Sequence, residues 1–363
     1  MILIFLIFFF LILRFTVTLF NFISNPKLTG SVRQYNDFVS ILIPARDEEQ
    51  DILNLLRSIS DQEYQNYEVI ILDDHSADNT LQVCQDYCSE NKRFQVFAGE
   101  VLPKDWLGKN FACSQLALAA KGKYLIFLDA DEIITEGLIN NAIHRMKLNR
   151  LSLLSLFTDQ TMLTWGERLV VPLMHFVLLN LLPLRLVRLS KNPVFSAASG
   201  QFMMFEAENY RENLWHERVK NRVVEDIEIM KQVKGLGYRG EVLLANGYIY
   251  CRMYKSFSEA VDGFSKNFLA GFNYNVSGLF LYLLLVVLGP IAIASILSFE
   301  LMLFALSLII LSRVMISLAS GQRVWQNILL HPVQLLCLVL ISVLSVKKYY
   351  TKTITWKGRT IRN

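Results

Sequence analysis

Cysteines are few in this chain, and their spacing along the sequence does not match a metal-binding pair. The five cysteines in 363 residues lack the pattern of a zinc site or of a disulfide framework. Cys84 and Cys88 lie four residues apart on an expected helix, and Cys113, Cys251 and Cys337 stand alone. We therefore expect free thiols, as in a reducing cytosol.

Glycine is missing from the first expected turn between a strand and a helix, residues 44–49 (Pro-Ala-Arg-Asp-Glu-Glu). A dinucleotide-binding turn and a P-loop both need glycine where the backbone approaches phosphate. Both are disfavoured here. The acids Asp47 to Glu49 by themselves are typical of a helix start, where negative charge favours the helix dipole.

A large excess of charge of either sign is also absent, since the formal net charge is +4. Basic residues stand beside apolar segments, at Lys27, Arg33 and in the tail, and not in a stripe with interleaved aromatics. This distribution favours anionic lipid over nucleic acid as a partner. The basic residues of the tail are Lys347, Lys348, Lys352, Lys357, Arg359 and Arg362.

Long apolar runs, in contrast, are abundant, and 53% hydrophobic residues is high for a soluble enzyme. The first run passes a single Arg14 and reaches Phe22. Because it has neither a charged n-region nor a small-residue cleavage site, we expect 1–22 to be a retained transmembrane anchor. A C-terminal membrane region, 276–346, precedes the basic tail 347–363 and contains candidate spans at 279–297, 301–318 and 328–346.

The side of the membrane follows from the basic residues next to the apolar runs. The positive-inside rule places both flanks of the soluble middle in the cytoplasm, so we expect a multi-pass protein of the cell membrane. Three full C-terminal crossings would carry the tail outside. Either one segment does not cross or the tail is outside, and Pro332 makes 328–346 the segment that we expect to be irregular.

The soluble middle, residues 37–274, begins with alternating strand and helix patterns. Strands are expected at 38–43, 67–72, 94–97 and 124–128, and helices at 51–60, 77–88 and 109–120. This alternation predicts an α/β fold with a mostly parallel sheet covered by helices on both faces. Later strands are expected at 151–157, 201–205 and 238–244, and a helix at 226–233.

Residues 168–188 interrupt this pattern. The segment is apolar but contains Pro172, His175 and Pro183, which is too interrupted for an easy span. It is well suited to lie in the membrane interface. A buried helix is the competing interpretation.

Three acidic clusters follow in order: Asp73-Asp74, Asp129-Ala130-Asp131 and Glu225-Asp226. The first two directly follow expected strands, so their carboxylates should gather at the ligand-binding edge of a parallel sheet. Carboxylates crowded there repel one another unless a divalent metal, or a substrate holding one, neutralises them. This arrangement indicates an enzyme acting on a nucleotide-diphosphate sugar.

Each cluster also has a structural interpretation. Ser76 or Asp78 is suited to cap the following helix, but only one side chain can cap, so Asp74 is a candidate to bind a nucleoside. Asp129 and Asp131, two apart on an extended segment, would project to the same side and hold one hard cation. Such a metal would stabilise charge on a departing nucleoside diphosphate.

Asp226 is the candidate general base, which would take the acceptor's proton during an inverting sugar transfer. Acids at a helix start are usually caps. A helix N-terminus would also lower the pKa of this carboxyl unless burial offsets the effect. His216, beside Trp215, is a candidate to contact acceptor or diphosphate, and the alternative is a partly exposed structural histidine.

The ordered motifs resemble membrane-attached family 2 glycosyltransferases with the GT-A fold. They are residues 43–49, 72–78, 129–131 and 224–226. More narrowly, the chain resembles the carotenoid (4,4'-diaponeurosporenoate) and hopanoid-associated glycosyltransferases, through residues 106–110, 199–202, 251–254, 263–267 and 356–359. The resemblance covers nearly the whole chain.

The resemblance implies a nucleoside site, a metal site and a base. Pro44, Ala45, Glu48 and Asp74 would contact the nucleoside, expected to be uridine. Gly200 and Gln201 would face the sugar or the acceptor. The motif Q-x-x-R-W, with which processive synthases hold a glycan, does not follow Asp226. Its absence favours a single transfer.

The remaining implied residues surround the diphosphate. Lys109 would lie near it, Asp129 and Asp131 would hold Mg²⁺ or Mn²⁺, and Asp226 would be the base, with Glu225 contacting substrate. We expect an inverting hexosyltransferase that uses a UDP-sugar and a membrane lipid such as a carotenoid acid. The alternatives are a processive polysaccharide synthase, a polyprenyl-phosphate glycosyltransferase, and an inactive membrane scaffold that keeps the fold.

Overall fold

The computed structural model describes residues 2–296, 298–353, 355–356 and 359–360, so Lys357 and Arg362 of the expected basic tail lie outside the described residues. The chain forms two compact units. We call them the sheet unit, Pro26–Thr161 and Leu184–Arg252, and the apolar unit, Met1–Asn25, Met162–Pro183 and Met253–Asn363. The apolar unit therefore takes two stretches, 162–183 and 253–274, that the sequence placed in the soluble middle.

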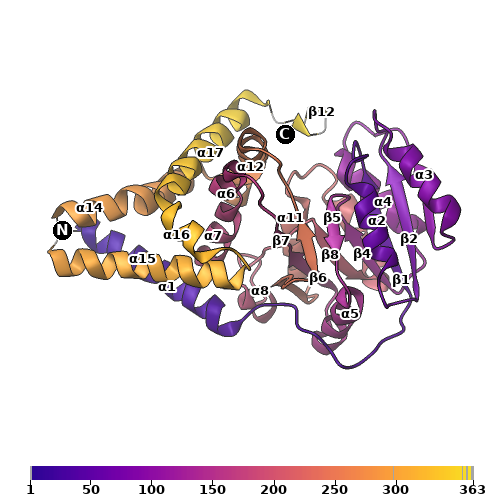
Figure 1. Ribbon diagram of the computed structural model, residues 1–363, viewed down its shortest axis with the longest axis horizontal. Coiled ribbons are helices and arrows are strands. Elements are labelled where there is room, and N and C mark those ends of the chain that lie inside the picture. The colour runs from indigo at the N-terminus through magenta and orange to yellow at the C-terminus, as the bar shows by residue number, and fades with distance from the viewer. Residues whose placement is uncertain (1, 297, 354, 357–358, 361–363) are drawn as a thin grey trace. The chain divides into compact units, whose positions relative to one another are not determined.

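A seven-stranded sheet of order β3-β2-β1-β4-β8-β6-β9 forms the centre of the sheet unit (Figure 1). Its strands are β1 (Val39–Ala45), β2 (Tyr67–Asp73), β3 (Phe94–Ala98), β4 (Tyr124–Leu128), β6 (Leu153–Phe157), β8 (Phe202–Glu206) and β9 (Gly240–Leu244). Only β8 runs antiparallel to its neighbours, β4 and β6. The expected mostly parallel sheet is confirmed.

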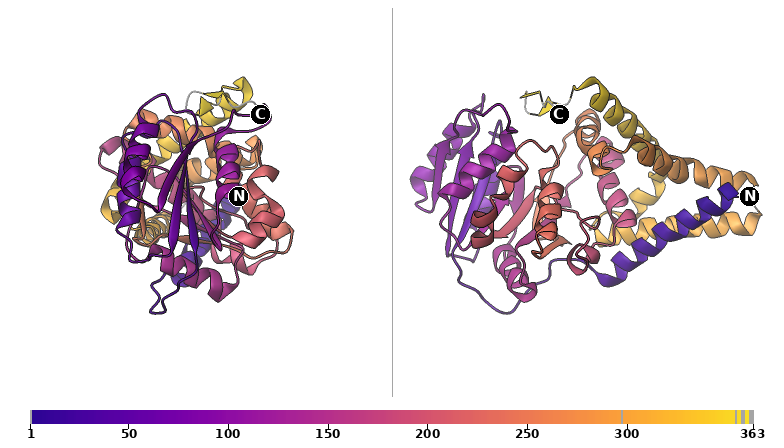
Figure 2. Two further views of the ribbon diagram at one scale, coloured as in Figure 1. Left: turned by 90° about the vertical axis from the view of Figure 1, so that its right-hand side faces the viewer. Right: turned by 180° about the vertical axis from the view of Figure 1, so that it is seen from behind.

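Helices cover both faces of this sheet (Figure 2). On one face, α2 (Ile52–Ser60), α3 (Thr80–Glu90) and α5 (Leu138–Asn149) share a core with alternate residues of the strands, such as Ile41 and Ile43. On the other face lie α4 (Gly108–Ala119), α9 (Ala207–Asn213) and α10 (Trp215–Arg218), where Phe127 stacks near Tyr210. Because the central strands are buried on both faces, their sequences are almost continuously apolar.

Strand β1 does not stop at Pro44, as we expected, but continues to Ala45. Pro44 is in register with Leu72 of β2, whereas the pairing of β1 with β4 ends at Leu42. Because Pro44 lies beyond the stretch paired with β4, its missing N–H removes no bond from that ladder. The strand can therefore carry Ala45 to the edge of the sheet.

A second, three-stranded sheet lies at the end of the main one. Its order is β5-β10-β7, with β5 (Glu132–Ile134), β7 (Asp159–Gln160) and β10 (Ile249–Cys251). The antiparallel register of β5 and β10 sets Glu132 opposite Cys251. Two further helices of this unit are α8 (Arg185–Leu189) and α11 (Glu225–Gly235).

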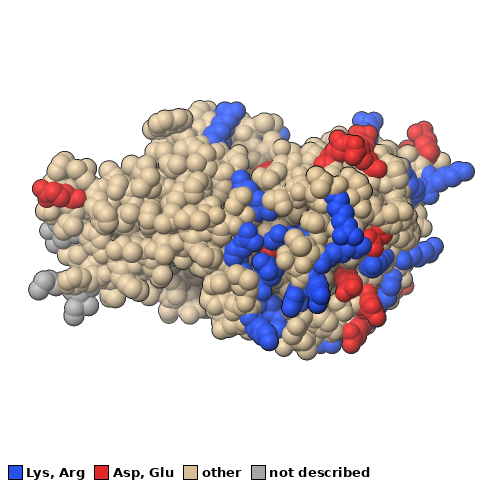
Figure 3. All heavy atoms as spheres, turned by 90° about the horizontal axis from the view of Figure 1, so that it is seen from below, with Lys and Arg blue, Asp and Glu red and all other residues tan. Residues whose placement is uncertain are grey.

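The apolar unit contains four helical stretches that are long and apolar enough to cross a membrane. They are Ile4–Ser24, Val276–Ile293, Phe299–Ala319 and His331–Thr351. The expectation of apolar helices at both ends of the chain is confirmed. On the face that Figure 3 shows, charged side chains are nearly absent over these helices, which suits a hydrocarbon environment.

The helices of this unit are α1 (Ile2–Ser24), α6 (Trp165–Val170), α7 (Pro172–Leu181), α12 (Phe257–Gly271), α13 (Val276–Leu283), α14 (Gly289–Ile296), α15 (Phe299–Ala319), α16 (Val324–Leu329) and α17 (His331–Thr351). Of the segment that we expected to be irregular, 328–346, residues 331–346 lie in the continuous helix α17, because Pro332 stands in its first turn, where proline is tolerated, and 328–329 end α16. The irregular turn is instead a π-helix, η1 (Leu284–Leu288), just before Pro290. Which helices cross the bilayer stays a prediction.

The interrupted segment 168–188 breaks at its prolines into α6, α7 and α8. Helix α7 buries Leu173, Phe176 and Leu179 and packs against α1 and α15. The side of α7 that carries these three residues is buried, as the buried-helix interpretation expected. Its location in the membrane interface stays a prediction.

Candidate active site

Lys109 contacts polar groups from two places, the residues that follow β4 and the start of α11. Lys109 Nζ lies 2.6 Å from Asp129 Oδ1 and 3.6 Å from Glu225 Oε1, and it donates to the carbonyl oxygen of Gly200 at 3.4 Å. Burial alone would lower the pKa of Lys109, but the charges of Asp129 and Glu225 outweigh it and raise that pKa. The lysine therefore stays a cation among carboxylates.

Gly200 lies at the middle of this group. Its N–H donates to Asp226 Oδ2 at 3.0 Å, and the N–H of Ile227 donates to Asp226 Oδ1 at 2.7 Å. A Cβ on residue 200 would lie 3.0 Å from Glu225 Oε1 and 3.1 Å from Lys109 Nζ. The close approach of this backbone to three charged groups therefore needs glycine.

Burial dominates the ionisation of the two acids of α11. It raises the pKa of Asp226, and the hydrogen bonds from Ile227 and Gly200 oppose it without cancelling it. Burial also raises the pKa of Glu225 to about 7, against the attraction of Lys109. A carboxylate with a raised pKa is a better proton acceptor, which is what a general base needs.

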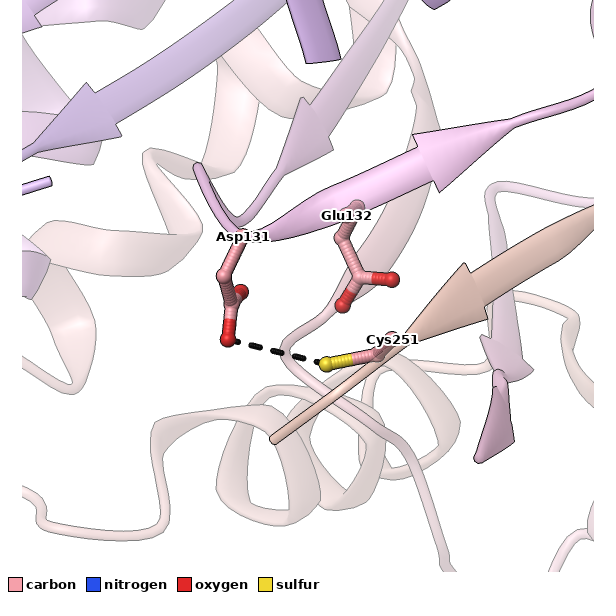
Figure 4. A group of neighbouring side chains, drawn as sticks. All are labelled: Asp131, Glu132 and Cys251. Carbon is pink, nitrogen blue, oxygen red and sulfur yellow. Dashed lines mark hydrogen bonds between the residues drawn. The ribbon is translucent and has the colours of Figure 1, made fainter. Parts of the chain in front are cut away.

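A second group lies where β5 meets β10 (Figure 4). The thiol of Cys251 donates to Asp131 Oδ2 at 3.6 Å, and ligand atoms of Asp131, Glu132 and Cys251 lie within 4.8 Å of one another. Both carboxylate oxygens of Glu132 are buried and have no hydrogen-bond partner among the described residues. A buried carboxylate left without donors needs a proton or a cation.

The electrostatics of this group fit a divalent cation. Burial, helped by the charges of Asp129 and Glu48, raises the pKa of Asp131 to about 7. Burial, helped by the charges of Asp131 and Asp129, raises the pKa of Glu132 well above its usual value. A metal would relieve this repulsion, and carboxylate oxygens suit Mg²⁺ or Mn²⁺.

Asp129 and Asp131 do not lie on an extended segment as we expected. Strand β4 ends at Leu128, and the chain turns at Ala130 and Asp131. Asp129 consequently contacts Lys109 while Asp131 contacts Cys251. Their joint role as metal ligands stays a prediction.

The expected nucleoside residues lie at the ends of β1 and β2. Pro44 and Ala45 close β1, and the N–H of Asp74 donates to the carbonyl oxygen of Ala45 at 2.8 Å. Arg46 Nη1 donates to the carbonyl oxygen of Asp74 at 2.6 Å and lies 3.9 Å from its Oδ2. The N–H of Glu48 donates to Thr80 at 2.7 Å.

The acids of residues 47–49 do not cap the helix that follows them. Asp47 Oδ1 accepts from the N–H of Ala77 at 2.7 Å, and Glu49 Oε2 accepts from the N–H of Asn79 at 3.0 Å. They therefore bind the loop before α3, whereas α2 has no side-chain cap. Asp78 accepts from the N–H of Thr80, as a cap would, and Ser76 accepts from the N–H of Asp47.

Two predicted contact residues turn out to be held inside the protein. Gln201 accepts a hydrogen bond from Thr158 at 2.9 Å, and its carbonyl oxygen accepts from the N–H of Asp129. Gln201 is thus placed to position Asp129. His216 is 2% exposed, and its Nδ1 lies 2.7 Å from the hydroxyl of Tyr210. The alternative interpretation, a partly exposed structural histidine, was wrong about the exposure, and a contact with acceptor or diphosphate stays a prediction.

Burial has a chemical consequence for His216. Together with the nearby charge of Lys109, it lowers the pKa of His216 to about 3. The imidazole therefore stays neutral and packs against the ring of Phe127, at 4.7 Å between centroids.

Three residues of the site were missed by sequence reasoning: Arg46, Glu132 and Cys251. Arg46 and Cys251 lie within motifs that carry the resemblance, 43–49 and 251–254, but no role was assigned to them, and Glu132 directly follows the motif 129–131. Cys251 lies 120 residues from its partner Asp131, and nothing in its spacing pointed to the site.

Comparisons with known proteins agree with the fold. Residues 40–213 match the family described as Glycosyl transferase family 2. The chain is 25% identical to 4,4'-diaponeurosporenoate glycosyltransferase of Staphylococcus haemolyticus over 336 residues, 88% of each protein. It is 29% identical to glycosyltransferase GlyG of Streptococcus pneumoniae over 104 residues, which span only 33% of that relative.

The fold is also found among solved structures. The mannosyltransferase PcManGT from Pyrobaculum calidifontis, in complex with GDP-Man and Mn²⁺, aligns with a TM-score of 0.54 at 15% identity. The alignment covers 92% of this chain and 95% of that one. It supports the GT-A fold.

Proposed function

Since this chain carries a family 2 glycosyltransferase domain, we propose that it moves one hexose from a UDP-sugar to a membrane lipid acceptor, with inversion at the anomeric carbon. The observation that carries the proposal is the set of contacts around Gly200, which involve Lys109, Asp129, Glu225 and Asp226. The N–H of Gly200 binds Asp226, and Lys109 contacts Asp129 and Glu225. Lys109, Glu225 and Asp226 surround the position that a side chain at residue 200 would occupy.

Each polar group has a role in this reaction. Asp226 would accept the proton of the acceptor as its oxygen attacks the anomeric carbon. Lys109 would bind an oxygen of the donor's diphosphate, and Glu225 would orient Lys109 through their 3.6 Å contact. Gln201 would hold the backbone of Asp129 in place.

The metal site is part of the proposal. Asp129 and Asp131, with Glu132 beside them, would hold Mg²⁺ or Mn²⁺, which when bound neutralises the diphosphate of the leaving nucleotide. The orphaned carboxylate of Glu132 supports a cation at this place. Pro44, Ala45, Glu48 and Asp74 would bind the nucleoside at the neighbouring edge of the sheet.

The acceptor and the location are argued together. The relative that covers 88% of this chain is named for a carotenoid acid, and four helices are long and apolar enough to span a bilayer. An apolar acceptor stays dissolved in the bilayer, so an enzyme anchored there meets it at high local concentration. We infer a carotenoid acid or another isoprenoid, with the sheet unit in the cytoplasm.

The test compares lipids made by membranes that contain the full-length protein with those made by an Asp226→Asn variant. Each is incubated with radiolabelled UDP-glucose and Mn²⁺, and the extracted lipids are analysed by mass. We expect one lipid that gains a single hexose unit, and a loss of roughly 10²-fold or more in the variant, while UDP binding persists. A glycan polymer, or a sugar on polyprenyl phosphate, would instead favour one of the rival enzymes. Equal turnover in both samples would contradict the role of Asp226, and no turnover in either would indicate a scaffold.

A further inference from the structure

A small cavity inside the apolar unit is lined by charged and polar groups. Its volume is about 30 Å³, and its polar lining consists of Arg14 of α1, Ser312 of α15 and His331 of α17. Aromatic and aliphatic side chains, among them Phe10 and Phe176, make up the rest of the wall. None of these residues belongs to the candidate active site.

Positive charge is concentrated around one aromatic ring. The guanidinium carbon of Arg14 lies 5.2 Å from the centroid of the Phe176 ring, and that of Arg313 lies 4.8 Å from the same centroid. The ring of His331 packs on it as well, at 5.4 Å between centroids. The face of a ring attracts a cation only weakly compared with a full counter-charge, so two arginines here remain uncompensated.

The described acids of the apolar unit do not pair with Arg14 or Arg313. Among the described residues, neither Arg14 nor Arg313 forms an ion pair with an acid, and the four acids of this unit serve elsewhere. Glu167 accepts from the N–H of Leu163, Glu259 accepts from the N–H of Lys255, Asp262 pairs with Lys266 and Lys348, and Glu300 is exposed in the first turn of α15.

Two of the groups also have unused hydrogen-bonding capacity. Arg313 is 1% exposed, and its Nη1 has no hydrogen-bond partner among the described residues, although its Nη2 donates to Gln334. The Nδ1 of His331 is likewise buried and without a partner. Arg14 donates from Nε to Asn180 at 3.2 Å.

The depth of Arg14 makes the missing counter-charge costly. It is the central residue of the apolar stretch Ile4–Ser24, so about 15 Å of helix lies on either side of it. A cation at such a position is expensive in hydrocarbon, and intramembrane ionisable residues normally face a partner or a functional pathway. Among its described residues, the apolar unit supplies no such anion.

We propose that this cavity binds the carboxylate of a long-chain apolar acid dissolved in the bilayer. Arg14 would pair with the carboxylate through its planar guanidinium, and Arg313 would strengthen the local positive field. The apolar wall suits the hydrocarbon chain. The planar guanidinium matches the two oxygens of a carboxylate, and a phospholipid headgroup is the alternative that the competition series tests.

The test measures binding and needs no donor sugar, so its outcome is independent of the proposed transfer reaction. The full-length protein in phosphatidylcholine nanodiscs is photolabelled with a diazirine analogue of palmitic acid. Palmitate, methyl palmitate and phosphatidylglycerol compete in separate samples. We expect palmitate to displace the label at a concentration about tenfold or more below that of its uncharged ester, and labelled peptides to come from α1, α7 or α17.

Variants locate the site. Arg14→Gln should weaken palmitate binding about tenfold or more, Arg14→Lys should recover part of it, and Arg323→Gln, at an exposed arginine of the same unit, should leave it unchanged. Equal displacement by the ester or by phosphatidylglycerol, or normal binding by Arg14→Gln, overturns the proposal. The competition series uses the unaltered protein, so it decides the question even where a variant fails to fold.

Discussion

At the scale of single residues, Gly200 is the position where the contacts of the candidate active site depend most on the identity of one residue. Its lack of a side chain lets a backbone N–H bind Asp226 while Lys109 donates to its carbonyl oxygen, and Glu225 Oε1 lies 3.0 Å from the place of a Cβ. The lysine can move, since its charged end is flexible, but the carboxylates are held by a helix start. A side chain here should therefore disturb the site and leave the fold intact.

We expect Gly200→Ala to lower kcat/KM about 10²-fold, because displacement of catalytic groups by a fraction of an ångström to an ångström is costly. Initial rates of sugar transfer with membranes of each variant provide the measurement. Gly235→Ala at the end of α11 is the matched control, since no heavy atom lies within 4 Å of the position of its new Cβ. Comparable losses in both variants would contradict the assignment.

The pH dependence of transfer follows from the buried acid pair. Because burial raises the pKa of Asp226, the base becomes protonated as the pH falls through a value above the ordinary aspartate pKa of about 4. The acid limb of kcat/KM should lie above that value. Glu225→Gln should move it to lower pH, since a neighbouring negative charge is removed. A limb at or below about pH 4 in the unaltered enzyme would refute the assignment of Asp226.

At the scale of elements, strand β9 is joined to two helices by one buried carboxylate. Glu241 is 2% exposed at its side chain, and it contacts Arg145 of α5 at 2.7 Å and Arg188 of α8 at 2.9 Å. Asn149 Nδ2 donates to the same carboxylate at 3.0 Å. Removing the acid would leave two guanidinium groups without their partner.

Glu241→Ala should lower the free energy of unfolding of the sheet unit by about 3–5 kcal/mol. Maleimide labelling of the buried thiols Cys84 and Cys113, as urea increases, reports the opening of this unit. Glu228→Ala removes a half-exposed pair with Lys231 and should cost less than about 1 kcal/mol. Similar midpoints for both variants would show that the buried pair contributes little.

At the scale of the whole molecule, the membrane topology is the main open prediction. We expect the sheet unit to face the cytoplasm. Cys88 is a native reporter, because it is the one cysteine of the described chain that is not fully buried. A membrane-impermeant maleimide should label it in permeabilised cells and not in intact ones, and Cys88→Ser should abolish that signal. Labelling of intact cells would place the sheet unit outside.

Much of this organisation follows from local sequence. Strongly apolar strand runs and helical spacing predicted β1, β2, β3 and β4 within one or two residues at each end, because burial on both faces leaves little choice of residue. The acids that follow the runs of β2 and β4 were recognised because parallel strands end at one edge. Those at the start of α11 were recognised through the order of the three acidic clusters and through the resemblance. The apolar helices at both ends were set by length and hydropathy alone.

The tertiary structure decided which of these groups meet. Cys251 reaches Asp131 through the pairing of β10 with β5, and Lys109 reaches Asp129, Gly200 and Glu225 from three separate segments. Likewise, only packing on Phe176 brings Arg14 and Arg313 to one ring. Composition and periodicity record the environment of each residue along its own element, whereas the partner of a charged side chain depends on contacts between segments far apart in the chain.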